Sequence, residues 1–192
     1  MKKNLLLMVM ILFCATAYAQ NKFNLADVKS LTFYGIDFSI AKVYGGKETA
    51  HQYWTTYADI NELFIDKPKT FSIEKRLGIP VDVISLEAVN QVNKKINPDS
   101  IKIDVSTYMP TGEQITEAVK NLPILSQEEK TGLVIVALFL NKADNRGTYQ
   151  FVVFNTKTRE IIEQWTNSGA GMGYNLKSYW GVSVYNAIKK IK

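Results

Sequence analysis

The sequence predicts an α/β (α+β) fold, in which one domain packs helices on a mixed sheet that ends in an antiparallel meander. Three observations support this prediction. Residues 133–140 are continuously apolar, as expected of a strand that is covered on both faces. Two further strand-like segments follow, with turn residues between them. Apolar residues at helical spacing occur before these strands, over residues 50–64, and again after them.

The first strand and the first long helix are predicted in the N-terminal third of the chain. Alternating apolar residues indicate a strand over residues 30–43, in which Gly35 suggests a bulge or a close backbone approach. A helix over residues 50–64 follows the turn at Gly45 and Gly46, and it should pack through aromatic rings. Its apolar stripe consists of Tyr53, Trp54, Tyr57, Ile60 and Phe64.

The middle of the chain has weaker patterns. A short helix is expected to end at Gly78, and a strand follows over residues 81–84. The polar residues 90–97 indicate an exposed connection. Alternating apolar residues from Ile101 to Val105 then predict another strand.

Two capping patterns precede the long apolar strand. Thr111 with Gln114 forms a capping box, because each side chain can bond the other's backbone N–H, and a short amphipathic helix over residues 115–122 follows. Ser126 with Glu129 repeats the pattern for a single turn.

The clearest pattern lies in the C-terminal part of the chain. Turn residues at 143–147 connect the apolar strand to strands over residues 149–154 and 160–165, which complete the meander. The glycine-rich segment 169–173 is predicted to be a loop between the last strand and a final helix. The apolar positions of that helix are Leu176, Trp180, Val184, Ala187 and Ile191.

Residues 1–19 have the three parts of a cleavable signal peptide. Two lysines form its positive end, a short apolar run follows, and Ala17 and Ala19 are the small residues that signal peptidase requires. The apolar run is too short to span a bilayer. We therefore expect an exported protein, periplasmic or extracellular, that is cleaved before Gln20 and forms one domain over residues 20–192.

Cys14 offers an alternative, because lipid attachment also uses a cysteine at the end of an apolar run. The residue before such a cysteine is normally small, whereas here it is Phe13. We expect Cys14 to leave with the signal peptide, and the mature chain then has no thiol. This prediction excludes disulfides, thiolate catalysis and cysteine-based metal sites.

The charge of the mature chain argues against a nucleic-acid partner. Loss of two of the 23 basic residues leaves 21 against 18 acidic residues, which is a formal charge of +3. The charged residues are scattered, without a run of five of one sign. The next most apolar stretch, residues 133–140, is too short to cross a bilayer. We therefore expect no transmembrane segment in the mature chain.

The candidate ligand site is the glycine-rich segment, because glycines before a helix let backbone amides approach an anion or another small ligand. Its residues are Gly169, Gly171, Gly173, Tyr174 and Asn175. Their spacing matches neither a dinucleotide fingerprint nor a P-loop, so no cofactor is predicted. The alternative interpretation is a loop that only turns the strand into the helix. Tyr174 is the freer aromatic ring, whereas Trp180 lies on the core stripe.

Few residues are suited to catalysis, so no catalytic residue and no metal site is predicted. His51 is the only histidine, and it lies off the apolar stripe of its helix, where a surface or capping role is expected. The segment 141–147 lacks the ligand spacing of a calcium loop and is expected to be a hairpin turn. The acidic residues considered as candidates are expected to be solvated. They are Glu62, Asp66, Asp82, Asp104 and Glu113.

The run Gly171-Met172-Gly173-Tyr174-Asn175, followed by Tyr179-Trp180-Gly181, resembles the C-terminal segment of an uncharacterised family of small exported α/β proteins of Bacteroidetes. In that family a strand meander leads to a G-x-G segment, a Y-W pair and a last helix. The resemblance is closest over the C-terminal part of the chain. It implies export and an α/β fold, and it supplies no catalytic residues.

Two functions from different classes fit these observations. The first is a non-enzymatic binding or accessory role in the cell envelope, with an envelope protein or a small ligand as the partner. The alternative is a carboxylate-dependent hydrolase that acts on a glycan or another periplasmic polymer. That chemistry requires two acidic groups about 5 to 10 Å apart in one cleft.

Overall fold

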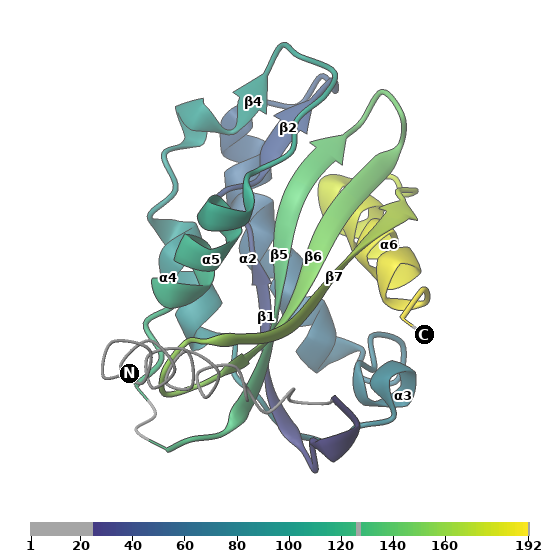
Figure 1. Ribbon diagram of the computed structural model, residues 1–192. Coiled ribbons are helices and arrows are strands. Elements are labelled where there is room, and N and C mark those ends of the chain that lie inside the picture. Colours follow the sequence, from purple (N-terminus) through teal and green to yellow (C-terminus); the bar gives the residue numbers. More distant parts are fainter. Residues whose placement is uncertain (1–24, 126–127, 192) are drawn as a thin grey trace, which may run out of the picture.

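The computed structural model describes residues 25–125 and 128–191 (Figure 1). The predicted signal peptide, Cys14 and Ser126 lie outside the described residues. Within the described part the α/β class is confirmed, because helices pack on one mixed sheet. No helix in residues 25–125 or 128–191 is long and apolar enough to cross a membrane.

The sheet is organised around one long central strand. Its strands are β1 (Leu31–Asp37), β2 (Lys42–Tyr44), β3 (Val81–Ile84), β4 (Lys102–Ile103), β5 (Thr131–Asn141), β6 (Arg146–Asn155) and β7 (Ile161–Ala170). Along one edge, β5 pairs in parallel first with β1 and, further along, with β2. The strand β3 pairs in parallel with β1, and β4 pairs in parallel with β2. Along the other edge, β6 and β7 form the predicted antiparallel meander. The central position predicted for β5 is therefore confirmed.

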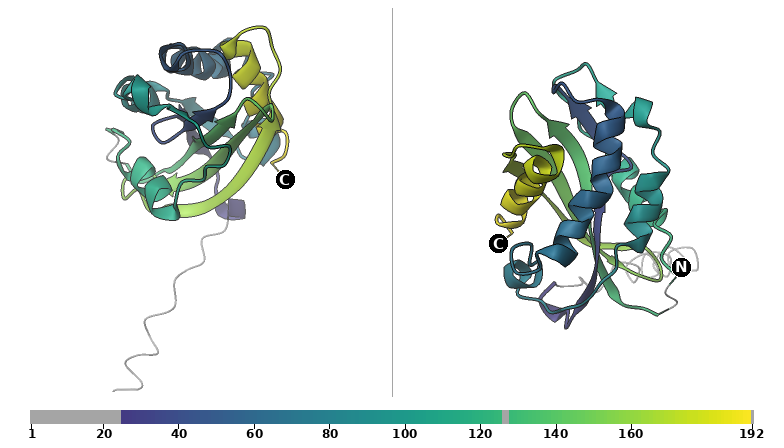
Figure 2. Two further views of the ribbon diagram at one scale, coloured as in Figure 1. Left: turned by 90° about the horizontal axis from the view of Figure 1, so that it is seen from above. Right: turned by 180° about the vertical axis from the view of Figure 1, so that it is seen from behind.

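The helices form a layer on each side of the sheet. They are α2 (Ala50–Asp66), α3 (Glu74–Leu77), α4 (Glu87–Lys94), α5 (Gly112–Lys120) and α6 (Leu176–Ile188), with short 3-10 helices η1 (Leu25–Asp27) and η2 (Pro98–Ser100). Figure 2 shows α2 and α6 together on one face of the sheet. The opposite face packs against apolar residues of α4 and α5.

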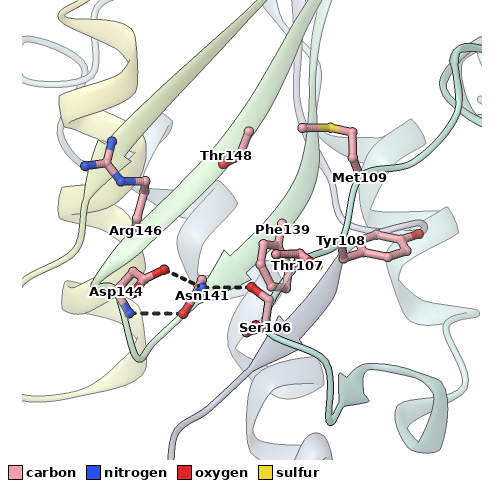
Figure 3. A pocket seen from close by; sticks show the side chains of 9 residues that line it. All are labelled: Ser106, Thr107, Tyr108, Met109, Phe139, Asn141, Asp144, Arg146 and Thr148. Carbon is pink, nitrogen blue, oxygen red and sulfur yellow. Dashed lines mark hydrogen bonds between the residues drawn. The ribbon is translucent and has the colours of Figure 1, made fainter.

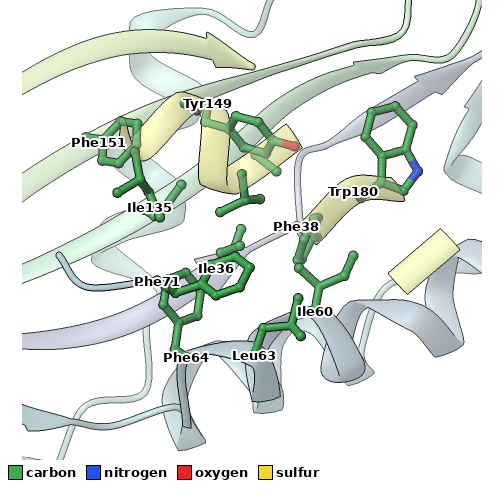
Figure 4. Packing of buried hydrophobic residues seen from close by; sticks show 14 of the residues in the cluster. Ile36, Phe38, Ile60, Leu63, Phe64, Phe71, Ile135, Tyr149, Phe151 and Trp180 are labelled. Carbon is green, nitrogen blue, oxygen red and sulfur yellow. The ribbon is translucent and has the colours of Figure 1, made fainter. Parts of the chain in front are cut away.

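The strand β5 is covered on both faces, as its continuous apolar sequence predicts. Leu133 and Ile135 face the core cluster under α2 and α6, which is drawn in Figure 4. Val134 and Val136 face the second cluster under α4 and α5. All four side chains are fully buried, so β5 is the structural centre of the fold.

Aromatic packing by α2 and the capping box predicted at Thr111 are confirmed. Tyr57 of α2 stacks on Phe38 with ring centroids 4.0 Å apart, and Phe64 meets Phe33 edge to face at 4.7 Å. Thr111 caps α5 in a capping box, as predicted. The same motif at Thr49, where the threonine oxygen accepts from the Gln52 N–H, starts α2.

Gly35 has the bulged conformation that the sequence suggested. Its φ is +87°, and the pairing of β1 with β5 shifts between Phe33 and Ile36. A Cβ at this position would lie 2.7 Å from Leu86 Cδ2 and 2.8 Å from Asn61 Oδ1. Glycine is therefore required here both by conformation and by close packing.

Two predicted strands differ from those observed. The segment 30–43 is two strands, because the chain turns at residues 38–41, where the Ala41 N–H donates to the Phe38 carbonyl at 3.0 Å. The strand predicted from Ile101 to Val105 is only Lys102–Ile103. Val105 is 58% exposed, so its apolar side chain does not mark a buried position.

The exposed connection predicted at residues 90–97 is wrong, because most of it belongs to α4. Its polar composition hides a buried structural residue, Asn93, which is 4% exposed. The Asn93 amide donates to the Ile36 carbonyl at 2.9 Å, and its Oδ1 accepts from the Phe38 N–H at 2.7 Å. Asn93 thus forms hydrogen bonds with buried backbone groups where β1 ends. The polarity of its side chain alone does not predict this role.

We expect Asn93→Ala to lower the free energy of unfolding by about 2 kcal/mol, because it leaves the buried Phe38 N–H without a partner. Urea denaturation followed by circular dichroism measures this loss. Gln91→Ala, at an exposed position of the same helix, is the matched control and should change stability by less than about 0.5 kcal/mol. Equal effects of the two variants would contradict the structural role of Asn93.

Candidate functional site

The glycine-rich segment is only partly a loop, so this element of the prediction is wrong. The strand β7 continues to Ala170 and includes Gly169. A Cβ on Gly169 would lie 1.9 Å from the Ser183 carbonyl oxygen of α6. Gly171 donates its N–H to the Asn145 carbonyl at 2.7 Å, and its Cβ would lie 2.5 Å from the Tyr179 ring. Both glycines therefore allow close packing between α6 and the sheet.

The other three residues of the candidate ligand site lie at the start of α6. Asn175 caps this helix, and its Oδ1 accepts from the Ser178 N–H at 2.8 Å. A Cβ on Gly173 would lie 2.4 Å from Ser178 Oγ. Tyr174 is fully exposed, in agreement with the prediction, whereas Trp180 is buried in the core. Ligand binding by this segment stays a prediction, and Tyr174 is the member with a free side chain.

A concave surface, the hairpin groove, lies beside the β5–β6 turn and has a volume of about 540 Å³. The irregular segment 106–109 forms one wall, and β6 with the turn forms the other (Figure 3). Its lining includes Thr107, Met109, Phe139, Asp144, Arg146 and Thr148. The groove thus combines an apolar floor and rim with hydroxyl, carboxylate and guanidinium groups.

The groove opens onto a polar face of β6 and β7. The helix α6 packs against the same two strands on their other face, where Tyr149 and Phe151 are buried. On the groove side, the exposed Arg146 donates from Nη1 to Ser168 Oγ at 3.0 Å. Further along β6, the buried Gln150 donates from Nε2 to Gln164 Oε1 at 3.1 Å. These cross-strand bonds hold the polar side chains in place along the sheet.

The segment 106–109 is held against β5 by contacts of Ser106 and Tyr108. Asn141 Nδ2 donates to the Ser106 carbonyl at 3.3 Å. The Tyr108 ring lies 6.1 Å from the Phe139 ring, and its hydroxyl donates to the Ile40 carbonyl at 3.3 Å. This wall is therefore positioned by contacts, although it has no regular secondary structure.

The β5–β6 turn is held by its own side chains and by α6. Asn141 bonds Asp144 twice, donating to Oδ2 at 2.8 Å and accepting from the backbone N–H at 3.0 Å. Lys142 forms an ion pair with Glu48 and lies 4.8 Å from the centroid of the Tyr179 ring. The predicted hairpin turn is confirmed, and its restraints fix the end of the groove.

Sequence reasoning treated residues 141–147 only as a turn and missed the groove. One signal was available. The polar residues Arg146, Thr148 and Gln150 alternate with the aromatic Tyr149 and Phe151, and this alternation indicates a strand with one polar face. In the structure Arg146 is exposed on that face, whereas Gln150 is buried. The opposite wall at residues 106–109 gave no such signal, because it is distant in sequence and irregular.

The predicted exposure of the candidate acids and of His51 is confirmed. All five acids are exposed, and His51 lies at the surface with its ring 5.3 Å from that of Trp54. Among the described residues that line the hairpin groove, Asp144 is the sole carboxylic acid. No group of three histidine, cysteine, aspartate or glutamate side chains in the described part of the chain is placed to hold a metal ion.

Comparisons with known proteins place this chain in no family. No family model matches it, and no curated protein matches it. Among solved structures, it is similar to the C-terminal domain of LpoB from Salmonella enterica, with a TM-score of 0.32 and 12% sequence identity. The match covers 74% of this chain and 82% of that chain. A similarity at this score is too low to carry an argument about function.

Proposed function

We propose that this protein is a non-enzymatic binding or accessory protein of the bacterial cell envelope, and that the hairpin groove is its binding surface. The observation that carries the proposal is the groove itself, whose walls are held by hydrogen bonds and which presents the exposed Arg146. Fixed polar groups beside an apolar floor are typical of binding sites. The envelope location rests on the signal peptide predicted over residues 1–19.

The chemistry of the groove supports binding over hydrolysis. The Asp144 carboxylate accepts a hydrogen bond from Asn141, and Arg146 donates to Ser168, so both charged side chains are held in fixed positions. A carboxylate-dependent hydrolase needs a second acid that faces the first across the substrate. Asp144 has no such counterpart among the described residues that line the groove.

Site-specific photocrosslinking tests the proposed binding surface. We expect a photoreactive benzoylphenylalanine at Met109, which is 62% exposed at the groove, to give an adduct of one defined mass in the producing bacterium. The same residue placed at Glu117, on the exposed side of α5, is the control and should give no such adduct. Equal crosslinking at the two positions, or none at Met109, would count against the proposal.

The alternative function is tested with the purified mature chain and isolated cell-wall sacculi. We expect no release of soluble fragments, as measured by mass spectrometry of the supernatant. Release by the unmodified chain that is lost in Asp144→Asn would instead establish the hydrolase and overturn the binding proposal.

A further inference from the structure

We propose that the hairpin groove binds an extended peptide segment that carries an acidic side chain, with the peptide backbone paired to residues 107–109 and its acid bound by Arg146. This inference rests on the proposed binding function and specifies the chemistry of the partner.

The first observation concerns the backbone of the groove wall. Residues 107–109 lie outside every helix and strand, and no backbone hydrogen bond joins them to another described residue. Pro110 follows, and it favours an extended conformation at Met109. An extended backbone with free N–H and C=O groups at a concave surface can add a further strand, the mode by which several domains bind peptides.

The second observation concerns charge on the opposite wall. Arg146 is exposed at the groove, and it forms no ion pair within residues 25–125 and 128–191. Its bond to Ser168 uses one N–H of a guanidinium that has five, so donors remain for a carboxylate. In Figure 3, Arg146 and Met109 lie on opposite sides of the groove, with Thr148 between them.

The remaining lining fits the alternation of an extended peptide. Successive side chains of a strand point to opposite sides, so an apolar residue beside the acid can contact the floor at Phe139 and the rim at Met109. Asp144 closes the groove at the turn, where Asn141 fixes it. The Asp144 carboxylate repels an acidic side chain of the peptide at that end. The acidic side chain of the peptide is therefore expected to bind Arg146.

The test uses the ¹⁵N-labelled mature chain and short synthetic peptides. The probe is acetyl-Thr-Val-Glu-Val-Thr-amide, together with versions in which Gln or Lys replaces Glu and one in which alternate backbone nitrogens are methylated. We expect the Glu peptide to shift the amide signals of Thr107, Met109 and Thr148. The Lys peptide and the methylated peptide should bind at least about tenfold more weakly, a difference of about 1.4 kcal/mol.

Arg146→Gln is the informative variant, because the glutamine amide can still donate a hydrogen bond toward Ser168 while the positive charge is lost. It should weaken binding of the Glu peptide by about tenfold and leave binding of the Gln peptide unchanged. Lys157→Gln, which removes a positive charge from the exposed β6–β7 turn, is the matched control and should leave both affinities unchanged.

Three results of the ligand titrations would each overturn the inference. These are equal affinity for the Glu and Lys peptides, equal affinity for the methylated peptide, and shifts of the groove amides by chitotetraose but by none of the peptides. A crosslinked partner at Met109 without any peptide-induced shift would refute the inference and leave the proposed function standing. Absence of both signals would refute the two together.

Discussion

Gly169→Ala should destabilise the protein by at least about 3 kcal/mol, the upper range for overpacking a core. The added Cβ would lie 1.9 Å from the Ser183 carbonyl oxygen and 2.7 Å from the Ala187 nitrogen, both in the backbone of α6. No rotamer change can relieve a contact with backbone atoms, so α6 must move away from β7. Urea denaturation followed by tryptophan fluorescence measures the loss, because Trp180 of α6 is buried in the core cluster and Trp165 of β7 packs against that cluster.

The matched control for this variant is Gly112→Ala at the start of α5. A Cβ there meets no atom within 4 Å, and Gly112 does not have a positive φ. Alanine should therefore be neutral or stabilise the protein by up to about 1 kcal/mol. If Gly169→Ala changed stability as little as Gly112→Ala, the close packing of α6 on β7 would be incorrect.

The same glycine shows where sequence reasoning reaches its limit. The spacing of glycines between a strand and a helix marks residues 169–173 as special, but it does not distinguish a ligand site from close packing. The deciding fact is that Ser183, fourteen positions later, brings its carbonyl against Gly169. Contacts of this kind depend on how α6 crosses the strand, which the sequence pattern does not specify.

Patterns repeated over many residues predicted the fold well. The continuous apolar run of β5, the aromatic stripe of α2 and the capping box at Thr111 each depend on local sequence, and all three are confirmed. The prediction failed at α4, because Asn93 is polar yet buried through bonds to the end of β1. The groove was missed because its two walls come from segments that are distant in sequence, residues 106–109 and 139–148.

A second large effect is expected from Asp37, which is buried at the end of β1. Its Oδ1 accepts from the Ser39 N–H at 2.7 Å, whereas its Oδ2 is buried without a hydrogen-bond partner among the described residues. Burial raises the pKa of Asp37 to about 6, against the smaller opposing effect of the Ser39 hydrogen bonds. Burial therefore disfavours the charged form in the folded protein relative to the unfolded chain.

The direction of the pH effect follows from this raised pKa. Between the unfolded pKa of about 4 and the folded pKa of about 6, the folded state holds a proton that the unfolded state has lost, so stability falls as pH rises. The stabilisation from protonated Asp37 is complete below about pH 4 and is lost as pH rises through about 6. A shift of about two units corresponds to about 3 kcal/mol by pH 7.5.

Asp37→Asn isolates this contribution, because asparagine is neutral at every pH and its Oδ1 can still accept from Ser39. The stability of the variant minus that of the unmodified chain should increase by about 2 kcal/mol from pH 4.5 to pH 7.5, as measured by urea denaturation at intermediate steps. Asp59→Asn, at an exposed position of α2, removes the same charge from the surface and serves as the control. If the stability difference between Asp37→Asn and the unmodified chain rose with pH no more steeply than that of Asp59→Asn, the Asp37 carboxylate would be hydrated in solution. The end of β1 would then be open to water, and the packing of α4 over it would need revision.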